Sequence, residues 1–346
     1  MTSIDIPTSY ESLNLTHIKI THHPCGAPEA TPVVVFTLDR PEKHNAFTPQ
    51  MADSLTQAYK MIHVDPRVKV VVLTGAGRMF CAGSDLGIGF GSGHGRAVDF
   101  RDMYVREHEP QQLEIIANAI AGSQWRSSRA SNASMPQAYY CRFEWICCRG
   151  WHDHDPASRY SVYILPIISD LSYSNQSRIC HEKSKYGFVF TRRGLTIESC
   201  ASYFLPRLVG FARAMHLITT GGVFPPTPQH FGDLFTEVLP DAGKILPRGL
   251  ELAQEIAENV SPLASSMSRA LMWEGADSPE AAHLLESRVF HHMIGQRDYR
   301  EGVHSFLEKR KPRFESDLRE TSSPNYPWWP EVDITREATV SKHSKL

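Results

Sequence analysis

Two adjacent cysteines and two histidines lie within the stretch WICCRGWHDHDP, residues 145–156. Thiolate sulfur and imidazole nitrogen are the usual ligands of structural zinc, so Cys147, Cys148, His152 and His154 are candidate zinc ligands. Structural zinc sites, however, usually separate their paired ligands by two or more residues, and adjacent cysteines followed by an H-x-H pair do not have this spacing. The pattern therefore disfavours a metal site without excluding one.

A glycine-rich loop, GAGRMFCAGSDLGIGFGSG, begins at Gly75, where an apolar run ends. Because glycine has no side chain, the backbone N–H groups of such a loop can approach a ligand and stabilise a developing negative charge. The simpler interpretation is that the glycines only form turns, which is the common role of loop glycines. The loop alone does not decide between these alternatives.

Glu198 is a candidate for proton transfer because it precedes a mostly apolar stretch, SCASYFLPRLV. A carboxyl group in an apolar pocket has a raised pKa and can act as a base and then as an acid near neutral pH. The alternative is that Glu198 is only an acidic residue favoured by the dipole at a helix N-terminus.

The elements that must position these residues follow from the apolar periodicity. Thr31–Leu38 (TPVVVFTL) and Val68–Gly75 (VKVVVLTG) are predicted to be buried strands. Between them we predict a helix with Thr48 as its N-cap and Pro49 in its first position. Strand, helix and strand in this order favour an α/β domain with crossover connections. One face of the helix carries Met51, Leu55, Ala58 and Met61/Ile62.

Composition limits the class of protein. The chain has 346 residues, 41% of them hydrophobic, and a net charge of −2, which is typical of a soluble globular protein without a nucleic-acid partner. The sequence lacks an apolar run long enough for a membrane span and has no secretory signal at its start. Seven cysteines without paired spacing do not predict a disulfide framework.

The C-terminal part is predicted to be helical over residues 246–320. SPLASSMSRALMW and SPEAAHLLESRVFHHMI both open with an N-cap serine followed by proline, and DYREGVHSFLEKR is a third expected helix. Residues 321–346 form a tail, in which NYPWWPEVD is expected to dock on the surface. The last three residues, Ser344, Lys345 and Leu346, match the S-K-L address for peroxisomal import, so an import receptor is an expected partner and the peroxisome the expected location.

Two segments together resemble the crotonase superfamily of enoyl-CoA hydratases and isomerases: RPEKHNAF (residues 40–47) and, after a helix, VVLTGAGRMFCAGSDL (residues 71–86). The resemblance implies an α/β, crotonase-like (ββα superhelix) core over residues 31–245, after an N-terminal extension over residues 1–30. It also implies an acyl-CoA thioester as substrate, no further cofactor, and assembly into homotrimers or hexamers. In such a site the N–H of Ser84 is half of an oxyanion hole, and the CoA site is lined by Asn45, Ala46, Ala82 and Gly83.

The resemblance resumes at Lys183, and the stretch GLTIESCASYFLPRLVG is most similar to the peroxisomal delta-3,delta-2-enoyl-CoA isomerases. It implies that Glu198 is the catalytic carboxylate. Hydratases of this superfamily use two glutamates to add water, and Phe190 stands where the second would be. We therefore expect an isomerase, with or without hydratase activity, in peroxisomal β-oxidation or in fungal toxin and other secondary-metabolite biosynthesis.

Residues 123–178 depart from the family pattern, which has a segment like KPxIAAxNGxAxGxG at this place. When the codons for Gln137–Ser158 are read one base forward, their degeneracy permits the sequence Lys-Pro-Ile-Ile-Ala-Ala-Leu-Asn-Gly-Ser-Ala-Val-Gly-Val-Gly-Met-Thr-Met-Thr-Leu-Pro. Two of the shifted codons begin within a tryptophan codon, and both of these must encode glycine. We therefore expect an out-of-frame, poorly ordered segment that lacks the second oxyanion donor. A catalytically impaired crotonase-like subunit and a zinc-binding interaction module remain as alternatives.

Overall fold

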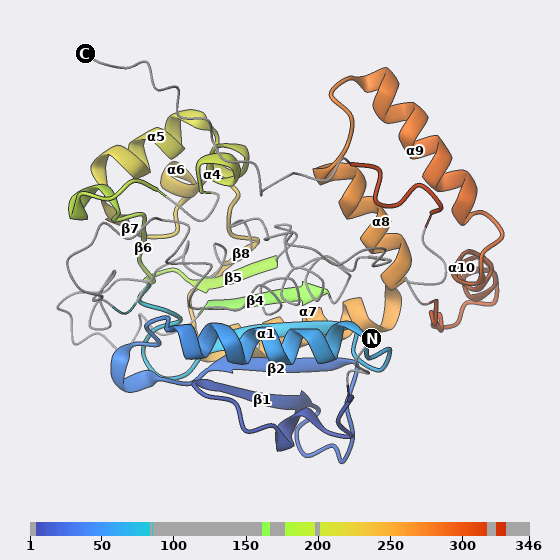
Figure 1. The fold of residues 1–346 in the computed structure, drawn as a ribbon, viewed down its shortest axis with the longest axis horizontal. Coiled ribbons are helices and arrows are strands. Elements are labelled where there is room, and N and C mark those ends of the chain that lie inside the picture. Colours follow the sequence, from blue (N-terminus) through green and yellow to red (C-terminus); the bar gives the residue numbers. More distant parts are fainter. Residues whose placement is uncertain are drawn as a thin grey trace, which may run out of the picture.

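The computed structural model describes residues 5–83, 85, 161–166, 177–197, 201–316 and 323–329, with the backbone alone over 161–166. Its centre is a six-stranded sheet with the order β1-β2-β3-β4-β5-β8 (Figure 1). A small second sheet pairs β6 with β7. The strands are β1 (Ile18–His23), β2 (Val33–Leu38), β3 (Val70–Gly75), β4 (Ser161–Pro166), β5 (Ser177–His181), β6 (Tyr186–Gly187), β7 (Val223–Phe224) and β8 (Glu237–Leu239).

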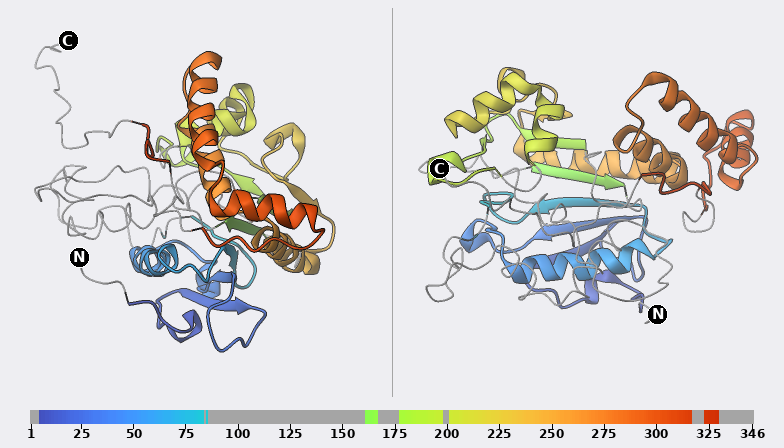
Figure 2. Two further views of the ribbon diagram at one scale, coloured as in Figure 1. Left: turned by 90° about the vertical axis from the view of Figure 1, so that its right-hand side faces the viewer. Right: turned by 45° about the horizontal axis from the view of Figure 1, so that its top comes forward.

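Helices cover both faces of this sheet. The helix α1 lies on one face and α7 on the other, where it packs across β2 to β5 (Figures 1 and 2). The α4–α6 group and the α8–α10 group lie at opposite ends of the molecule (Figure 1). The helices are α1 (Pro49–His63), α4 (Ala201–Val209), α5 (Phe211–Thr220), α6 (Pro228–Phe231), α7 (Ile245–Asn259), α8 (Pro262–Trp273), α9 (Pro279–Met293) and α10 (Arg297–Leu307).

The two predicted strands and the helix between them are confirmed. Strands β2 and β3 are parallel neighbours, with Val33 opposite Val70 and Leu38 opposite Gly75. Successive side chains of a strand point to opposite sides of the sheet, and helices cover both sides, so both strands are buried on both faces. Val34, Phe36 and Leu38 join the core on the α1 side, whereas Val33, Val35, Val70 and Val72 pack with α7.

Helix α1 begins as its sequence predicts. Thr48 is the N-cap and accepts a hydrogen bond from the N–H of Met51 at 3.1 Å, and Pro49 occupies the first helical position. Met51, Leu55, Ala58 and Ile62 are buried, whereas Met61 is half-buried and packs at the margin of the same core.

The C-terminal helices also begin at their predicted serine caps. Ser261 and Ser278 cap α8 and α9 through side-chain hydrogen bonds from Ala264 and Ala281. The tail docks as expected, since the indole N–H of Trp328 donates to the carbonyl of Glu274 at 2.7 Å. None of the helices in the described part of the chain combines the length and apolar content of a membrane span.

Strand β4 departs from the sequence-based expectation. Regular structure was not expected within residues 123–178, but Ser161–Pro166 pairs antiparallel with both β3 and β5. The apolar and β-branched residues of SVYILP favour a strand, and a strand between β3 and β5 satisfies the backbone groups of both neighbours. Strands β2, β3, β5 and β8 run in one direction, so β4 is a reversed strand inside an otherwise parallel series.

A buried ion pair fastens the N-terminal segment to the end of α1. The Asp65 side chain is 1% exposed and accepts hydrogen bonds from the Arg67 guanidinium at 2.7 Å and the Tyr10 hydroxyl at 2.9 Å. Arg67 also donates to the carbonyls of Pro7 and Thr8. Burial by itself would raise the pKa of Asp65, but the hydrogen bonds and charge of Arg67, with the Tyr10 hydroxyl, outweigh it and lower the pKa.

We predict that Asp65→Asn lowers the free energy of unfolding by about 2 kcal/mol, because it removes the charge of the buried acceptor of Arg67 and Tyr10 while the Arg67 side chain, 34% exposed, is partly solvated. Since the folded-state pKa of Asp65 is lowered, its contribution is complete above the ordinary aspartate pKa of about 4 and is lost as the pH falls through the folded value. Urea unfolding at neutral and acidic pH measures both effects. Glu255→Gln, an exposed carboxylate on α7, is the control; an equal loss in both variants would contradict the prediction.

Candidate active site

Two loops lie side by side at the carboxyl ends of β2 and β3. Residues 39–48 follow β2 and residues 76–85 follow β3, and because these strands are parallel neighbours, both loops emerge at the same edge of the sheet. Three backbone hydrogen bonds join the loops: Ala82 N–H to His44 O (3.0 Å), Phe47 N–H to Gly83 O (2.8 Å) and Asp85 N–H to Phe47 O (3.0 Å). The described part of the glycine-rich loop is therefore held by its neighbour at Ala82, Gly83 and Asp85.

Asn45 ties the two loops together with its side chain. Its amide nitrogen donates to the carbonyls of Ala76 at 2.8 Å and Met79 at 2.6 Å, and its amide oxygen accepts from the N–H of Arg40 at 2.8 Å. Its φ of 53° is in the left-handed region, which asparagine tolerates better than most residues. Asn45 is fully buried, so its side chain shapes the wall of the site and presents no polar atom at the surface.

The other three residues expected to line the CoA site lie on the same pair of loops. Ala46 and Ala82 are half-buried, and Gly83 is buried. Gly83 has a φ of 93°, a conformation that glycine adopts without strain, and its N–H donates to the Cys81 sulfur at 3.4 Å. Ser84, expected to supply the oxyanion N–H, lies outside the described residues, between Gly83 and Asp85.

A close ion pair also joins the loops, and sequence analysis did not single out its members. Arg40 Nη1 lies 2.6 Å from Asp85 Oδ2, and the two side chains are 13% and 15% exposed. The same guanidinium nitrogen donates to the carbonyl of Ala46 at 3.2 Å. Arg40 and Asp85 both belong to the segments that resemble the crotonase superfamily, residues 40–47 and 71–86. Because they are 45 positions apart, the sequence alone does not indicate that they pair.

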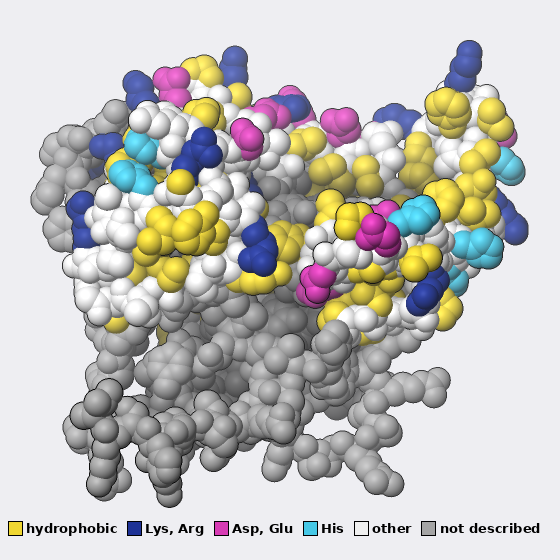
Figure 3. All heavy atoms as spheres, turned by 90° about the horizontal axis from the view of Figure 1, so that it is seen from above, with side chains coloured by type: hydrophobic (Ala, Val, Ile, Leu, Met, Phe, Trp, Pro, Cys, Tyr) yellow, Lys and Arg dark blue, Asp and Glu magenta, His cyan; other side chains and the backbone are white. Residues whose placement is uncertain are grey.

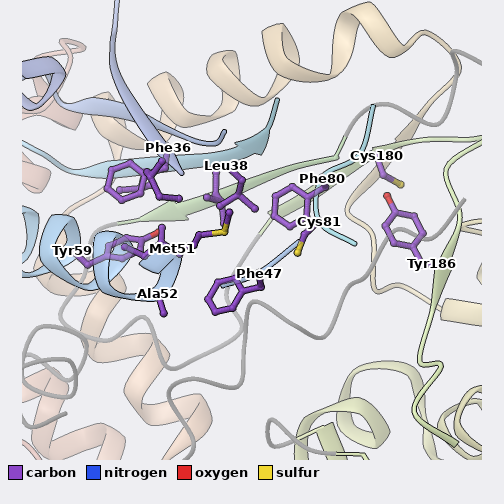
Figure 4. Packing of buried hydrophobic residues seen from close by; sticks show 14 of the residues in the cluster. Phe36, Leu38, Phe47, Met51, Ala52, Tyr59, Phe80, Cys81, Cys180 and Tyr186 are labelled. Atoms are coloured by element: carbon purple, nitrogen blue, oxygen red, sulfur yellow. The ribbon is translucent and has the colours of Figure 1, made fainter. Parts of the chain in front are cut away.

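Apolar packing supports the loops from behind. Phe80, Cys81 and Phe47 gather beside Leu38 at the end of β2, next to the α1 residue Met51 (Figure 4). All five side chains are buried. The loop backbone thus rests on a packed core that restricts its movement.

Cys180 on β5 lies beside Tyr186 in the same core (Figure 4). Burial raises the pKa of the Cys180 thiol to about 12, and a hydrogen bond with Tyr186 acts in the opposite direction. A thiol with so high a pKa is protonated at neutral pH, so it is not a candidate nucleophile.

Phe190 and the helix α4 lie on either side of the expected proton-transfer residue in the sequence. Phe190 is half-buried against the core, and its carbonyl accepts hydrogen bonds from Arg193 at 2.8 Å and Leu195 at 3.1 Å. Helix α4 begins at Ala201 and has an apolar buried face, as its sequence predicts. Glu198 lies outside the described residues, three positions before this helix.

The described residues contain no group of three or more histidine, cysteine, aspartate or glutamate side chains that could hold a metal ion. The candidate zinc ligands Cys147, Cys148, His152 and His154 lie outside the described residues. The described part of the site thus offers backbone N–H groups, the close Arg40–Asp85 ion pair and an apolar wall.

Comparison with known sequences identifies the family. Residues 29–115 and 171–317 match the family described as Enoyl-CoA hydratase/isomerase. Enoyl-CoA hydratase AFT3-1 of Alternaria alternata is 34% identical over 85% of this chain and 87% of its own length. Enoyl-CoA hydratase AKT3-2 of the same organism is 32% identical with the same coverage. The 1,2-epoxyphenylacetyl-CoA isomerase of Escherichia coli is 25% identical over 82% of this chain and 94% of its own length.

Solved structures share the fold. The enoyl-CoA hydratase of Bacillus anthracis aligns with a TM-score of 0.59 and 21% identity over 87% of this chain and 100% of its own. A probable enoyl-CoA hydratase/isomerase of Mycobacterium abscessus aligns with a TM-score of 0.55 and 25% identity over 83% of this chain and 97% of its own. The paired loops, the sheet that carries them and these similarities lead to one conclusion: the chain belongs to the enoyl-CoA hydratase/isomerase family of crotonase-fold enzymes.

Proposed function

We propose that this enzyme moves the double bond of an unsaturated acyl-CoA. The Glu198 carboxylate removes a proton from C2 of a 3-enoyl thioester, the double bond shifts to C2–C3, and the same proton returns to C4. The Ser84 N–H stabilises the negative charge that develops on the thioester oxygen. The observation that carries this proposal is the hydrogen bonding of Ala82, Gly83 and Asp85 to residues 44 and 47, which holds the described backbone on both sides of Ser84.

Isomerisation is favoured over hydration because of Phe190. Addition of water across the double bond requires a base for the water in addition to an acid for the carbon, and Phe190 supplies an apolar ring where family hydratases have a second carboxylate. Hydration is the second candidate function, supported by the similarity to the enoyl-CoA hydratases of Alternaria. The pathway we propose is fatty-acid β-oxidation or the tailoring of an unsaturated acid in fungal toxin biosynthesis.

Residues 123–178 are proposed to be translated out of frame. Two observations support this: the family match stops at residue 115 and resumes at residue 171, and β4 is reversed between β3 and β5, which are parallel to each other. Such a chain lacks the facing oxyanion donor, a loss of on the order of a hundredfold or more in rate. A catalytically impaired subunit that joins intact copies is the alternative, and a zinc-binding module ranks below it.

The oligomer and the location are proposals of the same kind. Exposed apolar side chains gather at both ends of the molecule, on α4–α5 and on α9–α10 (Figure 3). A contact that joins two different faces forms a ring when the rotation between copies closes, and we propose a trimer or a pair of trimers of this kind. The exposed apolar residues of these two surfaces include Tyr203, Phe211, Met215, Leu284, Phe290, Phe306 and Leu307.

Ser344–Leu346 are proposed to direct import into peroxisomes. A fluorescent fusion that keeps its peroxisomal location without these residues would contradict this.

The proton-transfer role predicts the effect of Glu198→Gln. Conversion of a 3-enoyl-CoA to the conjugated 2-enoyl-CoA, followed by its ultraviolet absorbance, should fall by on the order of 100- to 10,000-fold, because the amide cannot accept the C2 proton. Glu182→Gln, an exposed carboxylate after β5, is the matched control and should keep its activity. A Glu198→Gln variant as active as the control would eliminate the proposed role.

The frame proposal predicts the sequence of the transcript. Full-length cDNA from the source organism should encode the Lys-Pro-Ile-Ile to Met-Thr-Leu-Pro segment in place of Gln137–Ser158, and the protein made from it should exceed the present chain in turnover by about a hundredfold or more. A message that encodes WICCRGWHDHDP would instead establish an altered protein. The impaired-subunit and zinc alternatives would then be tested by co-purification and metal analysis.

The oligomer predicts a light-scattering mass of three or six times the 39.0 kDa of one chain. The double variant Phe306→Ser, Leu307→Ser should have a lower mass, because the substitutions remove apolar surface that a partner would bury. These two side chains are 82% and 71% exposed. Val238→Thr on β8 is the control, since Val238 is exposed but lies on neither face. A monomeric mass for the unaltered chain would refute the assembly.

A further inference from the structure

We infer that Arg40 and Asp85 form a positioning pair that sets the direction of the oxyanion-binding N–H. This inference rests on the proposed function, because it concerns the peptide group between Gly83 and Ser84. Neither side chain is proposed to touch the substrate. The pair acts through the backbone, by holding the residue that follows the oxyanion N–H against the neighbouring loop.

The geometry of the ion pair suits this task. Arg40 Nη1 and Asp85 Oδ2 are 2.6 Å apart, and the two side chains are mostly shielded from solvent. A charge-assisted hydrogen bond in such surroundings is stronger than an exposed one, because water competes less for either group. Glu42 is also near Arg40, at 3.8 Å, but its side chain is 66% exposed, so it competes weakly.

The glycine on the other side explains why an anchor is required. The carbonyl of Gly83 and the N–H of Ser84 belong to one planar peptide group, so whatever fixes that carbonyl fixes that N–H. Gly83, with a φ of 93°, has few steric limits of its own. Its carbonyl is held by the N–H of Phe47, and the carbonyl of Phe47 in turn accepts from the N–H of Asp85.

Arg40 is itself held in place, which makes it a suitable anchor. Its N–H donates to the amide oxygen of Asn45, and its carbonyl accepts from the Asn45 N–H at 2.9 Å. Its guanidinium also donates to the carbonyl of Ala46. The chain of contacts therefore runs from the buried Asn45, through Arg40, to Asp85 and the peptide group beside it.

The test uses butyryl-CoA, a saturated thioester that binds without being isomerised, carrying ¹³C at its carbonyl. Calorimetry gives its affinity, and the shift of the carbonyl infrared band on binding reports how well the N–H polarises the thioester oxygen. We expect Asp85→Asn to reduce the band shift at least twofold while the affinity for free CoA changes less than twofold. Where 3-enoyl-CoA turnover is measurable, kcat should fall on the order of 10- to 100-fold with little change in KM.

Arg40→Lys keeps the positive charge but loses the planar guanidinium, whose N–H donors have fixed directions. This variant should give an intermediate band shift even if Asp85→Asn folds poorly. Arg248→Met removes a more exposed pair, between Arg248 on α7 and Glu237 on β8 at 2.8 Å, and should leave the band unchanged. Full band shifts in both loop variants would overturn the positioning role and leave the proposed function standing. Failure of the unaltered chain to bind butyryl-CoA, or binding without a band shift, would overturn both.

Discussion

The active-site region is organised by hydrogen bonds to the buried backbone groups of the two loops that follow β2 and β3. The loops after β2 and β3 have little regular structure, yet they are packed against the core and cannot leave their carbonyls unpaired. Asn45 meets this requirement with one side chain, by pairing Ala76, Met79 and Arg40. The ladder between the loops and the Arg40–Asp85 pair both start from the geometry that Asn45 imposes.

Local sequence signals were sufficient for the elements that carry the loops. The β-branched runs of β2 and β3 and the Thr48-Pro49 start of α1 are short-range patterns, and the structure confirms each of them. The same holds for the serine caps of α8 and α9. Pairings between distant residues could not be predicted in this way, because Arg40 and Asp85 are 45 positions apart and the residues between them carry no sign that the two side chains meet. The reversed strand β4 was missed for a related reason, since its place in the sheet depends on pairing with β3, which is far from it in sequence.

The family match and the sheet topology divide the chain in the same place. The segments on both sides of residues 116–170 match the family, and they supply the parallel strands, the paired loops and the C-terminal helices. The residues between them contribute no matched segment. The match to the family model therefore comes from the two flanking segments.

The paired loops have a consequence for the order in which the protein folds during synthesis. Every contact that joins them lies within residues 40–85, so they and α1 can assemble soon after β3 leaves the ribosome. The opposite face of these strands, formed by Val33, Val35, Val70 and Val72, is covered by α7, which is made much later. The nascent chain therefore presents a strip of valines until α7 is made, and this strip is the part of the early-folding unit that is most exposed to aggregation.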